Sequence, residues 1–439
     1  MKKLLALLLL ALMLIPIAVS CASDDATTTV TTAPITTTAP VSTTAPITTT
    51  SPVTTTAPIT TTPIKYSITY ELNGGINAKN NPTEYNAGDV INLSFPEKED
   101  FMFMGWYTDS LFSNEITEIR DNSRDITLYA KWISYDEVLE ITKFDEQSRV
   151  VTGLKDGIDI KTIIIPSTYK GLPVTSIETG AFSFNDSIIK IVINDGITTI
   201  KTTAFYECTS LKSIILPSTL ATIEKNALGG CTSLESIYID EDSQNFKTVD
   251  GVLYSKDGSE LVRYPSAKEG TAFTVPNQVT TIKVGAFAGN TNLTDITLHN
   301  GITHIEEYAF SYFTTLESIV IPDSVIELGR GAFNKCTSLK SVSLPKNIEI
   351  IDINTFLGCT SLNNIVIPSG VKSIDRSAFY ECSSLESVII PKSVETIKEF
   401  AFDRCNEKLI IYAEAESLPD GWSNQLGPIL NAVWGYKDN

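Results

Sequence analysis

The sequence has few of the side chains on which catalysis and metal binding usually depend. Among its 439 residues there are two histidines, and the seven cysteines include no Cys-x-x-Cys pair. A Gly-x-Ser-x-Gly motif, a P-loop and a dinucleotide-binding fingerprint are also missing. We therefore expect no metal site, no cofactor and no enzymatic activity from this chain.

Positive charge is also scarce. The chain has 33 Lys and Arg residues against 52 Asp and Glu residues, which gives a formal net charge of −19. A nucleic-acid-binding surface needs a basic footprint for the phosphates, and electrostatic attachment to an anionic membrane needs one too. The charge balance excludes both kinds of partner, and it predicts a soluble, monomeric protein.

Long apolar runs are missing after residue 20, so any membrane anchor is expected at the N-terminus. There Lys2 and Lys3 precede an apolar run from Leu4 that ends in Ala-Val-Ser-Cys21. This arrangement resembles a bacterial lipoprotein leader of residues 1–21. The resemblance implies that Cys21 becomes the new N-terminus, carries the lipid and holds the protein on the extracellular face of the cell envelope. Ala18 departs from the leucine that is commoner in that family. The alternative is ordinary signal-peptide cleavage, which would release a secreted protein.

Residues 22–63 have a low-complexity composition that is dominated by Thr. From Thr27 to Pro63, Thr triplets alternate with Ala-Pro and Ser-Pro. This composition cannot form a core, and a proline stands every few residues. We expect a disordered, extended stalk. Such tracts often carry O-linked sugars, and the sequence does not separate a glycosylated stalk from an unmodified spacer.

Residues 64–133 differ in composition and alternate aromatic with polar side chains. Tyr66–Tyr70 alternates at period two, as a half-buried strand does, and the turn signal Asn73-Gly74-Gly75 follows. Aromatic strands are predicted at Phe101–Tyr107 and Leu128–Trp132. These three blocks, in this order, resemble the Listeria–Bacteroides repeat of bacterial surface proteins. The resemblance implies a β-grasp-like module that acts as a compact spacer or adhesive unit.

The rest of the chain follows one period of 23 residues. An aromatic anchor, usually preceded by Ala, recurs at Phe182, Phe205, Phe287, Phe310, Phe333, Phe356, Phe379 and Phe402, with Leu228 as a near-match. The single longer step, from 228 to 287, equals 23 plus an insertion of 36. A period of this length is typical of a leucine-rich-repeat solenoid, in which each repeat is one coil.

Other columns of the repeat supply the rest of one shared interior. An aliphatic residue stands five positions before each anchor, as at Ile305, and Leu usually stands six after it, as at Leu316. A short strand ends at a proline, as at Pro322, because the missing N–H stops the hydrogen-bond ladder. One coil cannot bury these side chains alone, so the coils must stack and the ends must be capped.

The Ile-Pro or Leu-Pro strands and the Ala-Phe anchors together resemble the BspA-type leucine-rich repeats of bacterial surface proteins. The fold class predicted is mainly β: a solenoid over residues 161–412 after the β-grasp-like module. Residues 134–160 are predicted to be the N-terminal cap and residues 413–439 the C-terminal cap. The glycine turns and short apolar runs near residues 240–270 predict a hairpin insertion, which is similar to one common in that family.

Cysteine and histidine fit structural roles in this repeat. Six cysteines each lie three residues after an anchor, in a column that also accepts Asn185, Asn290 and Phe313. Neighbouring coils lie about 4.8 Å apart, so disulfides are possible by distance, but parallel in-register side chains favour buried free thiols. His299 and His304 occupy replaceable columns and make a poor metal site.

The outward residue of each strand, thirteen before the anchor, is the candidate for binding. The row consists of Val192, Ile215, Tyr238, Thr274, Thr297, Val320, Ser343, Val366 and Ile389. It is either a consequence of strand propensity or a mildly apolar ribbon that a partner covers. We call this row the candidate ribbon.

The family resemblance implies an adhesin that binds a protein or glycoprotein ligand on host, matrix or neighbouring cells. The alternative is a structural or scavenging envelope lipoprotein that serves the cell itself. The sequence does not identify the ligand or the face that binds it.

Overall fold

The computed structural model describes residues 64–120, 123–426 and 431–437. The leader, with Cys21, and the stalk lie outside these residues. The described part is mainly β and belongs to one compact unit. None of its helices has the length and apolar character needed to cross a bilayer.

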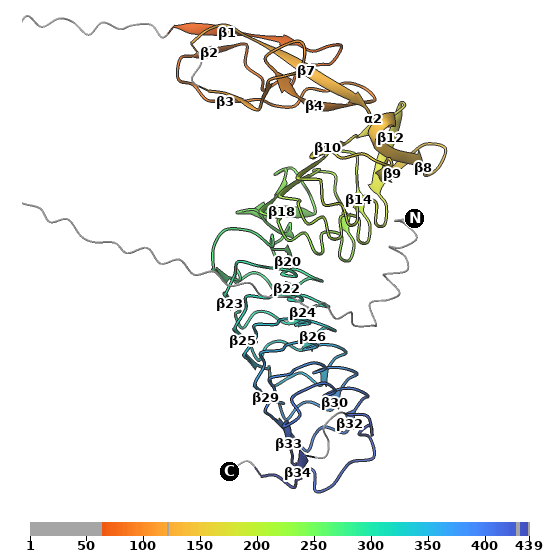
Figure 1. Ribbon diagram of the computed structural model, residues 1–439, viewed down its shortest axis with the longest axis vertical. Coiled ribbons are helices and arrows are strands. Elements are labelled where there is room, and N and C mark those ends of the chain that lie inside the picture. The colour runs from red at the N-terminus through yellow and green to blue at the C-terminus, as the bar shows by residue number, and fades with distance from the viewer. Residues whose placement is uncertain (1–63, 121–122, 427–430, 438–439) are drawn as a thin grey trace, which may run out of the picture. The chain divides into compact units, whose positions relative to one another are not determined.

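Residues 64–134 form a module around a mixed five-stranded sheet (Figure 1). The order in the sheet is β2 (Glu84–Asn86), β1 (Lys65–Glu71), β7 (Ile126–Ser134), β4 (Phe101–Tyr107), β5 (Glu115–Ile116). β1 and β7 pair in parallel, whereas β4 runs antiparallel to β7. A second, two-stranded sheet pairs β3 (Ile91–Asn92) with β6 (Glu118–Ile119). Aromatic side chains predicted from the alternation, such as Trp106, fill the core.

The module continues directly into the repeat array. After β7 comes α2 (Tyr135–Val138), and then the hairpin of β8 (Leu139–Lys143) and β9 (Arg149–Leu154). β9 pairs in parallel with the first coil, so the hairpin covers the start of the array. The Lys170 N–H donates to the Asp100 carboxylate at 2.8 Å, and Met102 shares one hydrophobic cluster with Ile163.

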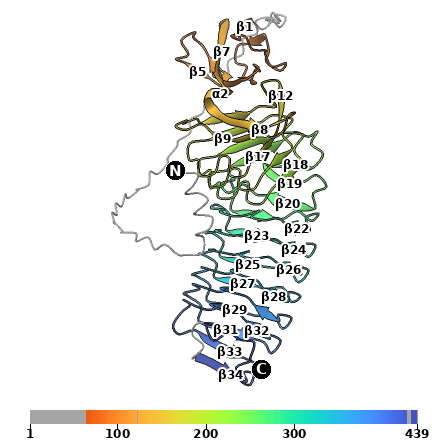
Figure 2. The ribbon, with the colours of Figure 1, turned by 90° about the vertical axis from the view of Figure 1, so that its right-hand side faces the viewer.

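Each coil contributes strands to two rows that run along the array (Figures 1 and 2). The long-strand row consists of β10 (Thr162–Ile165), β13 (Lys190–Ile193), β15 (Ser213–Leu216), β17 (Ser236–Ile239), β21 (Ala272–Thr274), β23 (Asp295–Thr297), β25 (Ser318–Val320), β27 (Ser341–Ser343), β29 (Asn364–Val366), β31 (Ser387–Ile390) and β33 (Ile410–Ala413). The short-strand row consists of β12 (Leu172–Ile177), β14 (Thr199–Ile200), β16 (Thr222–Ile223), β22 (Thr281–Ile282), β24 (His304–Ile305), β26 (Glu327–Leu328), β28 (Ile350–Ile351), β30 (Ser373–Ile374) and β32 (Thr396–Ile397). In the first coil, β11 (Thr168–Tyr169) pairs antiparallel with β12. Paired residues of neighbouring coils are 23 apart, as in Ile191 and Ile214.

The anchors form a third row inside the array. Successive rings stack nearly parallel, with centroids 5.1 Å apart both between Phe287 and Phe310 and between Phe310 and Phe333. Most of these anchors have no exposed surface. Burying each phenylalanine contributes about 1.5–3 kcal/mol, so this row is a major source of the stability of the solenoid.

The insertion forms three antiparallel strands, β18 (Phe246–Val249), β19 (Val252–Ser255) and β20 (Glu260–Arg263). They lie in a six-stranded sheet, in which β20 pairs in parallel with β22. The end of the insertion supplies an anchor that the Phe pattern did not predict. Tyr264 stacks on Phe287 at 5.4 Å, and its N–H donates to the Ala286 carbonyl at 2.8 Å, as a regular anchor does. The insertion therefore belongs to a coil of 36 residues rather than standing outside the array.

The C-terminal segment covers the last coil. The Phe402 N–H donates to the Leu426 carbonyl at 2.9 Å, where a further coil would otherwise accept it. Trp422 is buried and lies 5.7 Å from Trp434 between ring centroids. The last long strand, β33, is followed in its sheet by β34 (Ala432–Trp434). Strand pairing thus continues beyond residue 412.

Candidate binding surfaces

The candidate ribbon lies on the long-strand row, and its side chains point away from the core. Val320 is 69% exposed, Val366 63% and Tyr238 52%, whereas the inward neighbour Ile319 is 3% exposed. The remaining members fall into two groups. Thr274, Thr297 and Ser343 are exposed, and Val192, Ile215 and Ile389 are half-buried.

The insertion divides this row into two parts, which the repeat pattern did not predict. β17 is the last strand of its sheet and lies against β18 and β19 of the insertion, whereas later in the row β23 lies against β25 and β27 lies against β29. Beyond β17 the chain presents the turn of the insertion, where the Ile237 N–H donates to the Gly251 carbonyl at 3.0 Å. Val192, Ile215 and Tyr238 therefore form one group, and the members from Thr274 to Ile389 form another.

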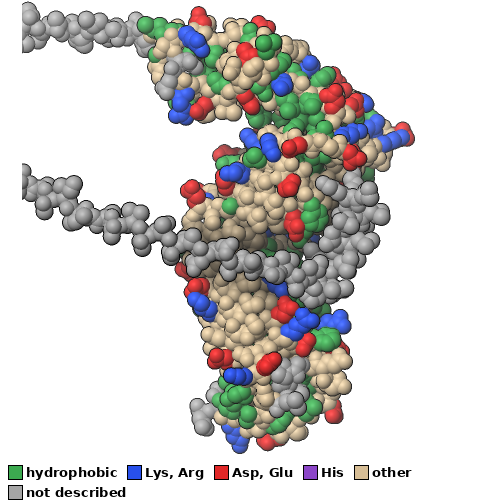
Figure 3. Space-filling view, viewed as in Figure 1, with side chains coloured by type: hydrophobic (Ala, Val, Ile, Leu, Met, Phe, Trp, Pro, Cys, Tyr) green, Lys and Arg blue, Asp and Glu red, His purple; other side chains and the backbone are tan. Residues whose placement is uncertain are grey.

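Charged side chains of both signs are interspersed over the face of the described residues shown in Figure 3. Many form ion pairs between neighbouring coils, as Lys372 does with Glu349 at 2.7 Å and Lys340 with Glu317 at 2.8 Å. The paired residues are again 23 apart, so opposite charges on adjacent coils face each other. These pairs are mostly exposed, and their contribution to stability is small.

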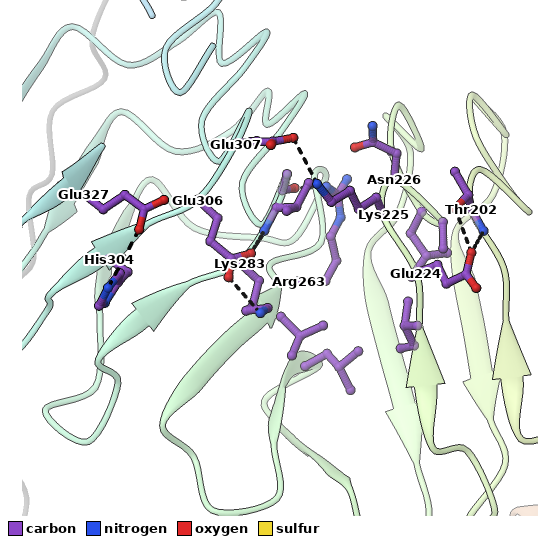
Figure 4. Close-up of a pocket in the computed structure, with 18 residues that line it drawn as sticks. Thr202, Glu224, Lys225, Asn226, Arg263, Lys283, His304, Glu306, Glu307 and Glu327 are labelled. Carbon is purple, nitrogen blue, oxygen red and sulfur yellow. Dashed lines mark hydrogen bonds and ion pairs between the residues drawn. The ribbon is translucent and has the colours of Figure 1, made fainter. Parts of the chain in front are cut away.

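A cleft of about 610 Å³ opens where the insertion interrupts the short-strand row (Figure 4). β16 forms one wall, and the coils that begin at β22 and β24 form the other. Ile223, Leu253 and Val262 give it an apolar floor. Charged side chains stand around the floor, among them Lys225, which is 3.3 Å from Glu307 on the opposite wall.

Arg263 joins the insertion to the next coil at the base of this cleft. It is 4% exposed, and its guanidinium donates to the Ala288 carbonyl at 3.1 Å and to the Ser266 hydroxyl at 2.9 Å. Its acceptors among the described residues are neutral, and its Nε atom has none there. Burial without a carboxylate partner lowers the pKa of the Arg263 guanidinium.

The six cysteines of the array are free thiols with a common structural role. Each Sγ donates to the carbonyl of the anchor one coil earlier, as Cys336 does to Phe310 at 3.0 Å and Cys359 does to Phe333 at 3.1 Å. Burial raises the pKa of the Cys231 thiol to about 11. These thiols fill a column of the core and do not approach one another as a metal site.

The histidines make local contacts. The His299 ring accepts from the Gly301 N–H at 3.0 Å and lies 3.0 Å from the Pro276 carbonyl. His304 lies 3.9 Å from Glu327 on the wall of the cleft. Among the described residues, no group of three His, Cys, Asp or Glu side chains is placed to hold a metal ion.

Comparison with solved structures finds other leucine-rich-repeat proteins. One from Eubacterium ventriosum is 20% identical, with a TM-score of 0.49 over 69% of this chain and 94% of the other. A leucine-rich cell surface protein from Faecalibacterium prausnitzii is 23% identical, with a TM-score of 0.35 over 69% and 98%. Among curated proteins, one of Evansella cellulosilytica named as a membrane protein is 37% identical over 73 residues. That match covers 16% of this chain and 10% of the relative's length.

Family models match most of the described chain. The Listeria-Bacteroides repeat domain matches residues 66–131. The BspA type leucine rich repeat region matches residues 155–254, 266–383 and 349–418, which together exceed half of the 439 residues. Repeats of this kind stack into extended surfaces that are used for binding. The chain is therefore a member of the BspA-type leucine-rich-repeat family that carries an N-terminal Listeria–Bacteroides repeat module.

Proposed function

We propose that this protein is a cell-surface adhesin that binds a protein or glycoprotein ligand through the candidate ribbon. In this proposal Cys21 carries a lipid in the cell envelope, and residues 22–63 form a stalk that holds the array away from the membrane. Membership of the BspA-type family supports an interaction role, and the name of the Evansella relative is consistent with an envelope location.

The observation that carries the proposal is the exposure of apolar side chains along the ribbon. Val320 and Val366 belong to strands of one row, two coils apart, and both expose more than 60% of their surface. Covering apolar area is favourable by about 25 cal/mol per Å², and a repeated row offers it over a long surface. The polar members between them, such as Ser343, suit a rim that a partner contacts through hydrogen bonds.

Binding by residues 64–439 tests the proposal, because the members of both hydrophobic clusters lie between residues 66 and 434. The fragment is immobilised and exposed to a panel of purified matrix glycoproteins. We expect saturable binding to at least one of them, and the double replacement Val320→Asp and Val366→Asp should weaken it about tenfold or more. Ile326→Asp is the matched control, because Ile326 is 58% exposed but lies off the ribbon.

Binding that the ribbon replacements leave unchanged would reject the ribbon as the site. No binding across the panel would favour the second candidate, a structural or scavenging lipoprotein that serves the cell itself. The anchor is tested separately by metabolic labelling with a radioactive fatty acid. Label that is present in the expressed chain and absent after Cys21→Ala supports lipid attachment, and release of unlabelled protein into the medium contradicts it.

A further inference from the structure

Backbone hydrogen bonds between anchors follow one rule along the array. The N–H of each anchor donates to the carbonyl just before the next anchor, as Phe205 does to Ala227 at 2.8 Å. Within the described residues, Leu228 is the one anchor whose N–H has no partner, and the N–H groups of Asn226 and Gly230 also lack one. The coil of Leu228 therefore ends in an open edge, because the long Tyr264 coil does not pair with it there.

The same coil has an open edge in the short-strand row. In the preceding coil, the Ile200 carbonyl accepts from the Glu224 N–H at 2.9 Å. The equivalent carbonyl of Ile223, and that of Ala221, accept no hydrogen bond from a described residue. β22, which would otherwise pair with β16, pairs with β20 of the insertion.

The cleft gives access to this edge from the β16 side. Ile223 and Leu228 both border it, and Val262 adds a half-buried apolar side chain to its lining. The two walls converge beyond Asn226, whose Oδ1 lies 3.4 Å from the position of a Cβ on Gly285. The space available is therefore beside β16, where a short segment of chain has room and a complete further coil does not.

We propose that this cleft binds a short extended segment of a separate polypeptide, which adds to β16 as a parallel strand. A peptide main chain offers N–H groups at the spacing that the carbonyls of Ala221 and Ile223 require. An apolar side chain of the segment then packs on Val262 and Ile223, which are both half-buried. This site is separate from the candidate ribbon and does not depend on it.

Charge around the cleft selects against an acidic segment. The walls carry four glutamates and two lysines. Lys283 pairs with Glu306 at 2.8 Å and Lys225 with Glu307 at 3.3 Å, so two glutamates of the walls have no lysine partner there. A neutral or basic segment avoids repulsion by the glutamates. The stalk of this chain is a poorer occupant, because prolines interrupt it every few residues and lack the N–H that pairing requires.

The probe is the labelled hexapeptide Thr-Thr-Ile-Lys-Val-Gly, the sequence of residues 280–285. In the array, the N–H groups of Thr281 and Lys283 in this segment donate to Ser259 and Leu261 of the insertion, and they match the open edge of β16 in spacing. We expect saturable binding to residues 22–439 by fluorescence polarisation below about 1 mM. The analogue with an N-methylated lysine cannot donate to the Ile223 carbonyl, and we expect it to bind about tenfold more weakly.

Hydrogen exchange locates the bound probe. We expect residues 221–230 to exchange faster than the paired segment 198–207 in the free protein, and the probe to slow exchange in the former only. Val262→Trp fills the cleft and should abolish binding, whereas Val320→Asp on the ribbon should leave it unchanged.

Three results would overturn the proposed site. They are the absence of saturable binding, equal binding of the N-methyl analogue, and protection outside residues 221–230. Tighter binding to residues 64–439 than to residues 22–439 would show that the stalk occupies the cleft, which contradicts a separate polypeptide as the occupant. Should Val262→Trp fail to fold, the N-methyl analogue still decides the outcome.

Discussion

At the scale of single residues, the anchors and the cysteines together link each coil to the next. The ring of one anchor stacks on the ring of the next, as Phe310 does on Phe333. The thiol three residues after the second anchor donates to the carbonyl of the first, as Cys336 does to Phe310. The column accepts Cys because a small apolar side chain with a weak donor fits there. Coils with Asn at the position satisfy local N–H groups instead, as Asn290 does for Leu293 at 2.8 Å.

Phe310→Ala should destabilise the array by about 3–5 kcal/mol, because it leaves a cavity between two stacked rings. Phe310 has no exposed surface and lies 5.1 Å from the rings on either side. Urea unfolding measures the loss, and hydrogen exchange should rise first in the coils next to it. Val320→Ala is the control at an exposed position, and an unfolding curve for Phe310→Ala that matches the wild type would contradict the anchor assignment.

The buried thiols should resist alkylation in the folded protein. Burial raises the pKa of Cys231 to about 11, so at pH 8 roughly one Cys231 thiol in a thousand is ionised. Mass spectrometry after iodoacetamide treatment should find slow modification in the native state and six modified array thiols after denaturation without reductant. Fewer than six would indicate disulfides between coils.

The same thiols link stability to pH. Because the pKa of Cys231 in the folded state lies above its unfolded value of about 8.5, its contribution is complete below that pH and declines as pH rises toward 11. The free energy of unfolding of Cys231→Ala, measured by urea titration at several pH values, should therefore fall less steeply above pH 8.5 than that of the wild type. An unchanged pH profile in that variant would assign the loss to other groups.

At the scale of elements, the turn after every anchor except Tyr264 has a fixed backbone conformation. The residue two after the anchor has positive φ, whether it is Gly358 at 70° or Tyr312 at 55°. A residue with a Cβ is less favourable there by about 1–2 kcal/mol. The turn column is thus specified by backbone geometry and not by side-chain chemistry.

This conformation predicts an unusual ranking at position 312. Tyr312 is 57% exposed, so its removal sacrifices little packing. Tyr312→Gly should be more stable than Tyr312→Ala by about 1 kcal/mol, because glycine adopts positive φ without steric cost. The midpoints of urea unfolding compare the two variants directly. A Tyr312→Ala variant that is more stable than Tyr312→Gly would contradict the claim that positive φ is unfavourable for a residue with a Cβ at this position.

At the scale of the whole molecule, the 23-residue period predicted most of the solenoid, but it did not predict how the long coil of Tyr264 interrupts the array. The 23-residue columns identify the strands, the anchors and the inward residues, because stacking repeats the same contacts in each coil. The columns did not predict Tyr264 as an anchor, because Ser259 stands where its coil should have an aliphatic residue. The long coil of Tyr264 also divides the ribbon and opens the cleft beside Leu228. Both depend on which strands pair at the insertion, and the repeat pattern contains no information on that pairing.

The insertion also divides the interior. One hydrophobic cluster joins the module to the coils up to Ile237 and to Leu253 of the insertion, and a second runs from Val252 to Leu426. Backbone pairing of the anchor row is interrupted at the same place, at Leu228. In a repeat array, the total stability is the sum of contributions from the coils and from the interfaces between them, so a weak interface separates cooperative units. We therefore expect two unfolding transitions rather than one.

The four tryptophans of the chain report on these units separately. Trp106 and Trp132 belong to the first cluster, and Trp422 and Trp434 to the second. With Trp106→Phe and Trp132→Phe, fluorescence in a urea titration follows the second cluster alone. In that background Phe379→Ala should lower the midpoint, whereas Phe205→Ala, an equal truncation on the other side of the insertion, should leave it in place. Equal shifts from both variants would mean that the interface at the insertion is strong enough to make the solenoid a single cooperative unit.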